Sequence, residues 1–201
     1  MKTIIVLIIG ILCTNNAISQ SALTYFSRGN SKYKLNDYRG AILDYNKAIE
    51  LNPTLAEAYI NRGNTKNDLN DYRGAILDFN KAIELNPTLA EAYSNRGNSK
   101  SDLNDNRDAI LDFNKAIELN PTLAEAYSNR GVSKGKLNDY RGAILDFNKA
   151  IELNPTLAKV FNNRGTAKSF LGDKNGSCLD WSKAGELGYG NAYDSIKKYC
   201  N

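Results

Sequence analysis

The chain has 201 residues, of which 24% are charged and 42% hydrophobic, the balance of an ordinary soluble globular protein. Its net charge of +4 is spread along the chain without a run of lysine or arginine, so we expect neither nucleic acid nor an anionic membrane as a partner. Histidine is absent, which removes the commonest general base and the usual nitrogen ligand of zinc. Because phosphate-binding glycine loops and complete calcium loops are also absent, we expect no enzyme and no cofactor.

Residues 1–19 have the composition of a secretory signal peptide. A basic residue precedes the apolar run Ile4 to Leu12, and a small-x-small cleavage site ends at Ser19. This run is far shorter than the roughly 20 residues that a membrane-spanning helix needs. A lipid anchor on Cys13 is the alternative, and the bulky residue before that cysteine disfavours it. We therefore expect a mature chain that is exported, periplasmic or secreted, and not inserted in a membrane.

The rest of the chain repeats with a period of 34 residues. Prolines stand at 53, 87, 121 and 155, and the string AILDFNKAIELNPTLA begins at 75, 109 and 143. Between the prolines lie two segments with the three-and-four spacing of amphipathic helices. Tyr59 and Gly63 lie on the core side of the first helix in one copy, and Ala75 and Phe79 on that of the second. Each copy is therefore predicted to form a helix, a tight turn and a second helix.

Local signals mark the ends of these helices. Thr54 and Glu57 have the spacing of a capping box at the start of the first helix. Asp71 is a good N-cap for the second helix. Asn70 stands in the turn between them, where the left-handed conformation that ends a helix favours asparagine or glycine. Equivalent residues recur in most copies.

This pattern resembles the tetratricopeptide repeat, because the small and aromatic positions of that family recur together at its period. The resemblance covers residues 22–191 and implies an all-α fold, a right-handed α-solenoid of five stacked helix-turn-helix units. The units are 22–55, 56–89, 90–123, 124–157 and 158–191, of which the last is degenerate. Residues 191–201 are predicted to form a C-terminal capping helix, because terminal repeats must cover their apolar face.

Each unit departs from the family in one charged pair. An arginine occupies a position on the first helix that is usually apolar, and an aspartate follows it 16 residues later. A buried arginine needs a countercharge, so we predict an ion pair inside each unit. The pairs are Arg28 with Asp44, Arg62 with Asp78, Arg96 with Asp112, Arg130 with Asp146, and Arg164 with Asp180. The alternative is a row of arginines that binds an anionic ligand.

The family resemblance implies a concave groove, lined mainly by the first helix of each unit, that binds a protein or an extended peptide. Asparagine recurs along these helices, and in tetratricopeptide proteins such rows hold the backbone of a bound peptide. The candidate groove residues are Asn61, Asn64, Asn95, Asn98, Asn129 and Asn163. The alternative is a solvated surface that duplication of one unit has copied.

Two cysteines follow the leader, and an exported chain permits them to pair. We predict a disulfide between Cys178 and Cys200 that joins the capping helix to the fifth unit; the alternative is a free Cys200 on a frayed end. The expected function is a non-catalytic scaffold for protein–protein interaction. An architectural or assembly component of the cell envelope, interacting with surface polymers, is the alternative. The sequence predicts neither the identity of the partner nor the oligomeric state.

Overall fold

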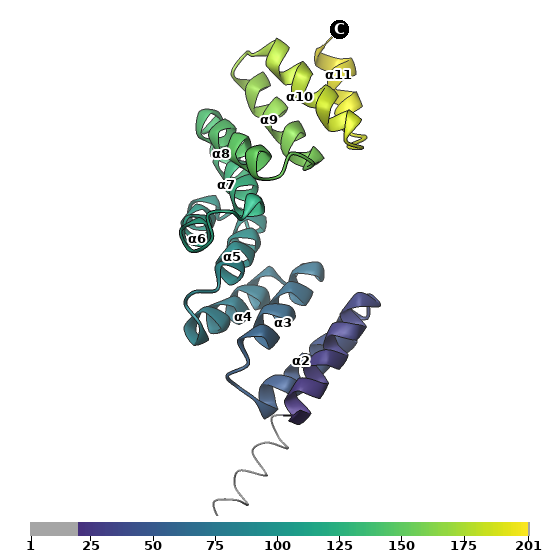
Figure 1. Cartoon of the computed structure of the whole chain (residues 1–201), viewed down its shortest axis with the longest axis vertical. Coiled ribbons are helices and arrows are strands. Elements are labelled where there is room, and N and C mark those ends of the chain that lie inside the picture. Colours follow the sequence, from purple (N-terminus) through teal and green to yellow (C-terminus); the bar gives the residue numbers. More distant parts are fainter. Residues whose placement is uncertain (1–19, 201) are drawn as a thin grey trace, which may run out of the picture. The chain divides into compact units, whose positions relative to one another are not determined.

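A computed structural model describes residues 20–200, and within this range the chain is helical with no β-strand, as Figure 1 shows. The predicted signal peptide lies outside the described residues. Residues 20–34 are helical. The helices that follow are α2 (Tyr38–Leu51), α3 (Ala56–Asp68), α4 (Tyr72–Leu85), α5 (Ala90–Asp102), α6 (Asn106–Leu119), α7 (Ala124–Lys136), α8 (Tyr140–Leu153), α9 (Ala158–Phe170), α10 (Lys174–Glu186) and α11 (Ala192–Tyr199). The expected all-α fold of consecutive helix-turn-helix units is confirmed.

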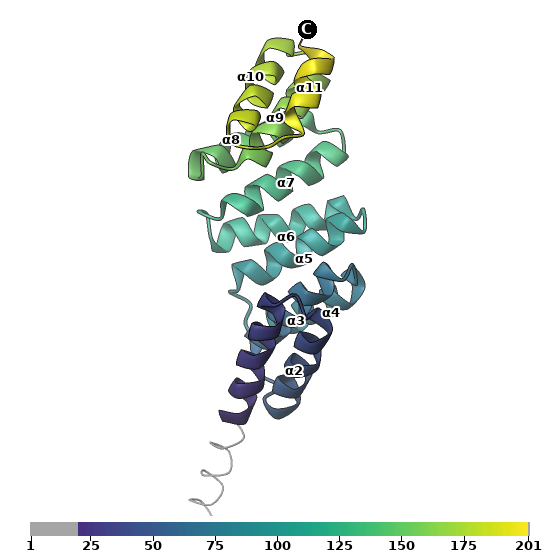
Figure 2. The ribbon, with the colours of Figure 1, turned by 90° about the vertical axis from the view of Figure 1, so that its right-hand side faces the viewer.

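The chain divides after Asn95 into two compact parts, which we call the N-terminal body and the C-terminal body. Within each body, consecutive helices form hairpins, such as α3 with α4 and α7 with α8 (Figures 1 and 2). Neighbouring hairpins also pack together, so that α2 contacts α3 and α8 contacts α9. We call the surface that the first helices of the hairpins form within each body its first-helix face.

The tight turn inside each hairpin has the predicted conformation. Asn36, Asn70, Asn104 and Asn138 adopt φ values of 60–64°, and Gly172 takes the same place with φ 81°. Asparagine tolerates this left-handed region because its short side chain bonds locally, and glycine because it has no Cβ. The chain therefore reverses at the same point in all five hairpins.

The start of each second helix depends on a matched aspartate and glycine. Asp71 caps α4 by accepting a hydrogen bond from the backbone N–H of Gly74 at 3.0 Å. A Cβ on Gly74 would lie 2.1 Å from the Asp71 carboxylate, so a larger residue there would displace the cap. In α6 the equivalent glycine is replaced by Asp108, and Asp105 makes no side-chain cap bond. Glycine is thus required for this cap.

The predicted capping box at the first helices is wrong. Leu55 is the N-cap of α3, and no side chain caps that helix. The hydroxyl and the backbone N–H of Thr54 instead donate to Asn52 Oδ1, at 2.8 and 3.2 Å. The hydroxyls of Thr88, Thr122 and Thr156 bond in the same way. The asparagine two residues before each threonine accepts these hydrogen bonds. It competes with the capping box because an Asx turn closes over fewer residues.

The core consists mainly of the small and aromatic residues that recur at the 34-residue period. Phe79 is fully buried between the helices of its hairpin, beside Ala75 and Ala82. Gly63 permits this packing, since a Cβ there would lie 2.7 Å from the Phe79 ring. The missing side chain at Gly63 therefore leaves room for the aromatic ring between two closely packed helices.

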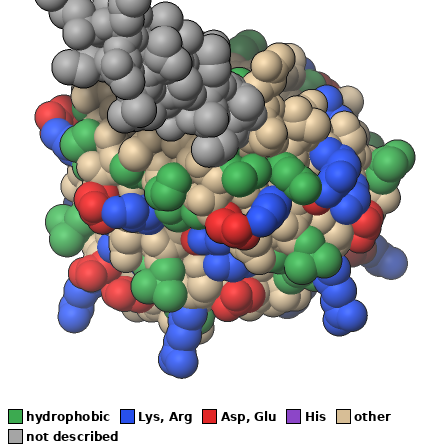
Figure 3. Space-filling model, turned by 90° about the horizontal axis from the view of Figure 1, so that it is seen from below, with side chains coloured by type: hydrophobic (Ala, Val, Ile, Leu, Met, Phe, Trp, Pro, Cys, Tyr) green, Lys and Arg blue, Asp and Glu red, His purple; other side chains and the backbone are tan. Residues whose placement is uncertain are grey.

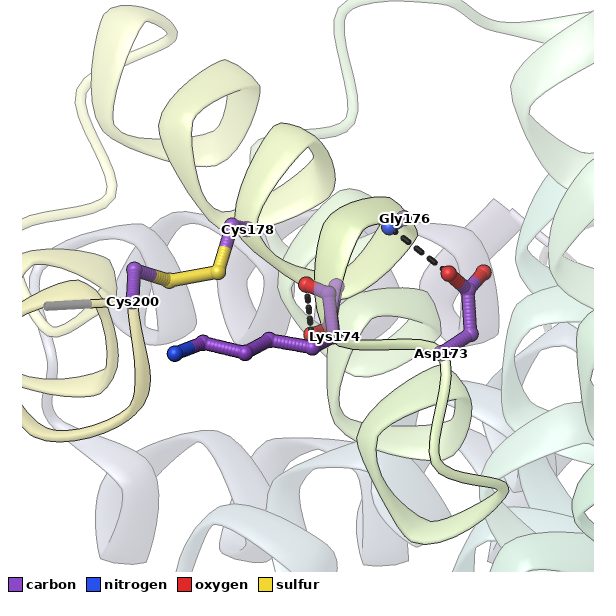
Figure 4. Close-up of a disulfide and its surroundings, with 6 residues drawn as sticks. Asp173, Lys174, Gly176, Cys178 and Cys200 are labelled. Carbon is purple, nitrogen blue, oxygen red and sulfur yellow. Dashed lines mark hydrogen bonds between the residues drawn. A yellow bond between two sulfur atoms is a disulfide. The ribbon is translucent and has the colours of Figure 1, made fainter.

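Helix α11 covers the end of the C-terminal body, beside α10 in both ribbon views (Figures 1 and 2). Ala192 of α11 is fully buried in a cluster with Phe161 and Trp181. A disulfide joins Cys178 of α10 to Cys200 just after α11, as Figure 4 shows. The C-terminal helix is therefore held by both an apolar contact and a covalent bond.

Candidate functional site

The structure brings each predicted arginine and aspartate together. Asp78 is buried on α4 and accepts two bonds from Arg62 of α3, from Nε at 3.0 Å and Nη2 at 2.5 Å. Two parallel bonds to one carboxylate match the planar fork of a guanidinium. The equivalent pairs are Arg28–Asp44, Arg96–Asp112, Arg130–Asp146 and Arg164–Asp180.

Each of these aspartates also binds a lysine, which the sequence analysis did not anticipate. Lys66 Nζ lies 2.7 Å from Asp78 Oδ2, one turn of α3 after Arg62. The equivalent lysines are Lys32, Lys100, Lys134 and Lys168. The signal for it was available, since a lysine stands four residues after every one of the five arginines. Residues four apart on a helix share a face, so both cations reach one carboxylate.

The arginines also link successive hairpins. Arg62 Nη1 donates to Asn46 Oδ1 of the preceding hairpin at 2.6 Å, and its guanidinium carbon lies 5.5 Å from the Tyr59 ring centroid. Arg130 and Arg164 bond Asn114 and Asn148 in the same way. The side chain of Arg62 is only 18% exposed. Its donors are directed to protein acceptors, which favours the structural interpretation over a row that binds an anionic ligand.

The candidate asparagines bond one another across neighbouring first helices. Asn129 Nδ2 of α7 donates to Asn98 Oδ1 of α5 at 2.8 Å. In the N-terminal body Asn95 donates to Asn64 at 2.9 Å, and Asn61 to Asn30 at 2.8 Å. The six candidates are all partly buried. Three side-chain hydrogen bonds between asparagines therefore join neighbouring hairpins.

This series of bonds ends in the C-terminal body. The position equivalent to Asn98 in the next hairpin holds Val132, so Asn163 of α9 has no asparagine acceptor on α7. Asn163 instead lines a pocket of about 360 Å³ together with Val132 and Phe170. A second pocket, of about 300 Å³, lies in the N-terminal body and is lined by Asn30, Tyr33, Lys34, Tyr45, Asn61 and Asn64.

The pocket of the N-terminal body contains two tyrosines with raised pKa values. The Tyr33 hydroxyl donates to Asp68 Oδ2 at 2.7 Å, and this bond raises the pKa of Tyr33 to about 12. Burial raises the pKa of Tyr45 to about 12, and its hydroxyl donates to Asn30 Oδ1 at 2.8 Å. Both side chains are therefore neutral near pH 7 and supply hydrogen bonds without charge.

Other surface features are less specific. Figure 3 shows a face on which Lys and Arg side chains alternate with Asp and Glu, while hydrophobic side chains stand apart. Within residues 20–200, no cluster of three or more His, Cys, Asp or Glu side chains has the arrangement of a metal site. No helix in that range combines the length and the apolar character needed to cross a membrane.

Several solved structures share this fold. The crystal structure of MamA protein is 26% identical, covers 90% of this chain and 96% of its own, and has a TM-score of 0.73. The first TPR of Spaghetti (RPAP3), bound to HSP90 peptide SRMEEVD, is 30% identical over 60% of this chain and 95% of its own, with a TM-score of 0.59. YrrB, described as a TPR protein with an unusual peptide-binding site, is 24% identical over 90% of this chain and 96% of its own, with a TM-score of 0.71.

Sequence comparisons point to the same family. No curated protein matches the chain with significant similarity. A family profile described as TPR repeat matches residues 29–66, and one described as Tetratricopeptide repeat matches residues 56–89, 90–123 and 124–157. These matches extend over more than half of the 201 residues. The chain belongs to the tetratricopeptide repeat family.

Proposed function

We propose that this protein is a non-catalytic scaffold that binds a protein or an extended peptide along its first-helix face. Tetratricopeptide folds commonly mediate protein–protein or peptide binding, and the similar domain of RPAP3 was solved with a bound HSP90 peptide. The observation that carries the proposal is the set of partly buried asparagines on consecutive first helices. The pockets of about 300 and 360 Å³ lie beside them.

Asn129 illustrates how these residues serve two purposes. A side-chain amide has two N–H donors and one carbonyl oxygen that accepts. The bond to Asn98 uses one donor, and Asn129 has no other side-chain hydrogen bond within the described residues. One N–H and the carbonyl oxygen can therefore pair with a peptide backbone without reading its side chains. The bond to Asn98 also holds the amide in place before a ligand arrives, which reduces the entropy cost of binding.

Export of the chain is part of the proposal. The signal-like composition of residues 1–19 supports it. The disulfide between Cys178 and Cys200 supports it as well, because disulfides persist in oxidising compartments. The intact mass of protein recovered from the periplasmic or extracellular fraction should correspond to a chain that begins at Gln20. A mass that includes the leader, or protein found only in the cytoplasm, would contradict export.

Site-specific crosslinking tests the binding surface. A photoreactive residue in place of Thr166 would stand on the first-helix face of the C-terminal body, where Thr166 is exposed and lines the pocket. The matched control replaces Leu145, which is 69% exposed on α8. We expect illumination in the producing cell to crosslink one protein partner at the first position and not at the second.

Three outcomes decide the proposal. Crosslinking at the Thr166 position alone supports binding along the first-helix face. Equal crosslinking at both positions contradicts the face that we assign. Retention of the protein on insoluble surface polymer, with no protein crosslinked at either position, favours an architectural role in the cell envelope instead.

A further inference from the structure

The first-helix face changes chemistry between the last two hairpins of the repeat. In the second and third hairpins the acceptor asparagine is followed four residues later by an acid, as with Asn64 and Asp68 or Asn98 and Asp102. The first hairpin has a lysine, Lys34, at that place. The same two positions of α7 hold Val132 and Lys136. On α9 the second position holds Phe170. An apolar, positively charged segment thus replaces a polar, acidic one.

The pocket at this place combines apolar and aromatic residues with the polar side chains of Lys136, Asn138, Asn163 and Thr166. Its lining includes Val132 and Gly135 of α7, Tyr140 and Phe147 of α8, and Phe170 of α9. Phe170 is 65% exposed, although it is one of the largest hydrophobic residues of the chain. Its ring stacks on Tyr140 with centroids 4.5 Å apart and an interplanar angle of 5°. This stacking holds an exposed aromatic surface in a fixed orientation, as an anchor pocket requires.

Positive charge borders this pocket without a counterion. Lys136 Nζ donates to the backbone carbonyl and hydroxyl oxygens of Ser101, at 2.9 and 3.1 Å. Within the described residues, no carboxylate lies within ion-pair distance of Lys136. Helix α9, on the other side of the pocket, contains no aspartate or glutamate. Its Arg164 and Lys168 both contact the Asp180 carboxylate, so Lys136 is the basic residue of the pocket lining that has no carboxylate partner.

We propose that this pocket binds a large apolar side chain of an extended peptide, with a neighbouring carboxylate of the same peptide on Lys136. Charge complementarity selects the acidic neighbour, and the exposed face of Phe170 selects the apolar residue. Asn129 and Asn163 stand on the same two helices, where their amides can pair with the peptide backbone. The inference rests on the proposed function and adds a specificity to it. The pocket of the N-terminal body, which is lined by asparagine, tyrosine and lysine, has no equivalent apolar anchor.

Selection from random peptides tests this specificity. A phage library of random dodecapeptides is panned against the mature chain, residues 20–201, with its disulfide intact. We expect the enriched peptides to share a Leu, Ile, Met or Phe beside an Asp or Glu. In fluorescence anisotropy with one enriched peptide, replacing that apolar residue by serine should weaken binding roughly tenfold to a hundredfold.

Matched variants locate the site. Phe170→Asp should weaken binding of the enriched peptide by roughly tenfold or more. The substitution removes the aromatic surface and adds a negative charge that repels the carboxylate of the peptide. Leu145→Asp is the control, since Leu145 is 69% exposed on α8 and outside the pocket lining. Lys136→Asp introduces the acid that stands at this place in the second and third hairpins, and it should shift the preference from acidic to basic neighbours. Circular dichroism confirms that each variant is folded.

The outcomes separate this inference from the proposed function. Two results would overturn the anchor pocket and leave the scaffold proposal standing, provided that the enriched peptides crosslink to the Thr166 position. In the first, the enriched peptides lack the apolar–acidic pair. In the second, they bind Phe170→Asp as tightly as the wild-type chain. Peptides that crosslink only away from the first-helix face overturn both, as does a selection that enriches none. The shared motif, together with selective loss in Phe170→Asp, supports both.

Discussion

At the scale of single residues, each hairpin buries an aspartate that binds two cations. Asp146 is buried, and both Arg130 and Lys134 contact its carboxylate, at 2.6 and 2.8 Å. Removing a charge from water costs several kcal/mol, and the pair offsets that cost only when its geometry is good. Lys149 and Glu152 lie equally close, at 2.6 Å, yet their side chains are 39% and 67% exposed. The two sets of ion pairs have similar distances, so the difference in burial is what should make their contributions to stability differ.

Replacing the buried acid should cost far more stability than replacing the exposed one. Asp146→Asn leaves Arg130 and Lys134 without a countercharge, and we expect the free energy of unfolding to fall by about 3–5 kcal/mol. Glu152→Gln removes an exposed pair and should change it by about 0.5 kcal/mol or less. Urea unfolding of both variants measures the difference. Equal effects would contradict a structural role for the buried pair.

The ion pair of the first hairpin should make the stability of the fold depend on pH. Hydrogen bonding from Arg28 lowers the pKa of Asp44 from 3.8 to about 2. Since the folded pKa lies below the ordinary one, the carboxylate stabilises the fold above pH 3.8, and this contribution is lost as pH falls toward 2. The stability difference between wild type and Asp44→Asn should therefore shrink as pH is lowered from about 4 to about 2.

Glu50→Gln is the control for this titration, because the Glu50 side chain is 66% exposed. Its stability difference from wild type should be small at every pH tested. A difference for Asp44→Asn that stays constant across the same range would mean that the ion pair does not form in the folded protein.

At the scale of helices, polar bonds of two kinds join one hairpin to the next. Arginines bond the asparagines of the preceding second helix, as in Arg130 with Asn114. Asparagines bond across first helices, as in Asn129 with Asn98. Because repeat proteins gain stability from interfaces between neighbours, these bonds contribute to cooperativity along the array.

A double-mutant cycle measures the asparagine bond. Asn98→Ala and Asn129→Ala, made singly and together, should show a coupling energy of about 0.5–1.5 kcal/mol in unfolding experiments. The chain contains its own control, because Val132 replaces the acceptor one hairpin later. Asn163→Ala should therefore cost less than Asn129→Ala. No coupling between Asn98 and Asn129 would contradict the link between hairpins.

The disulfide should stabilise the C-terminal hairpin measurably. Cys178 and Cys200 are 22 residues apart, and closing a loop of that size contributes on the order of 3 kcal/mol in the chain-entropy model. Replacing both cysteines by serine should lower the free energy of unfolding by about that amount. Alkylation of the unreduced protein, followed by mass measurement, should label neither cysteine. Two labelled thiols would mean that α11 is not linked covalently.

At the scale of the whole molecule, the chain consists of two compact bodies, and the C-terminal one ends in a helix unlike the repeat. Helix α11 covers Phe161 and Trp181, which are 8% and 2% exposed with it in place. A repeat array needs such a cap because its last hairpin would otherwise present the surface that internal hairpins bury.

Truncation tests the cap. A chain that ends after Leu187 lacks α11 and should aggregate at concentrations where the full chain stays monodisperse, because apolar surface around Trp181 becomes exposed. The double cysteine-to-serine variant is the control, since it keeps α11 and loses only the covalent bond. Light scattering compares the three proteins. A soluble truncation with an unchanged melting temperature would contradict the capping role.

Much of this architecture follows from the sequence alone, because the determining interactions are local or recur at one period. The 34-residue spacing predicts the hairpins, and Asn70 predicts the turn, since few residues tolerate φ near 60°. The Arg62–Asp78 pair is predictable as well, because an arginine on a helix face that meets its partner helix needs an acid within reach.

Tertiary structure decided the contacts whose geometry depends on how hairpins stack. The sequence shows that Asn98 and Asn129 recur, but only the packing of α5 and α7 places their amides 2.8 Å apart. Packing likewise joins Val132 and Phe170, 38 residues apart, in one pocket. A residue pattern specifies the face of a helix on which a side chain lies. The rotation between neighbouring hairpins, which sets the distance across that face, comes from the sum of all their packed side chains.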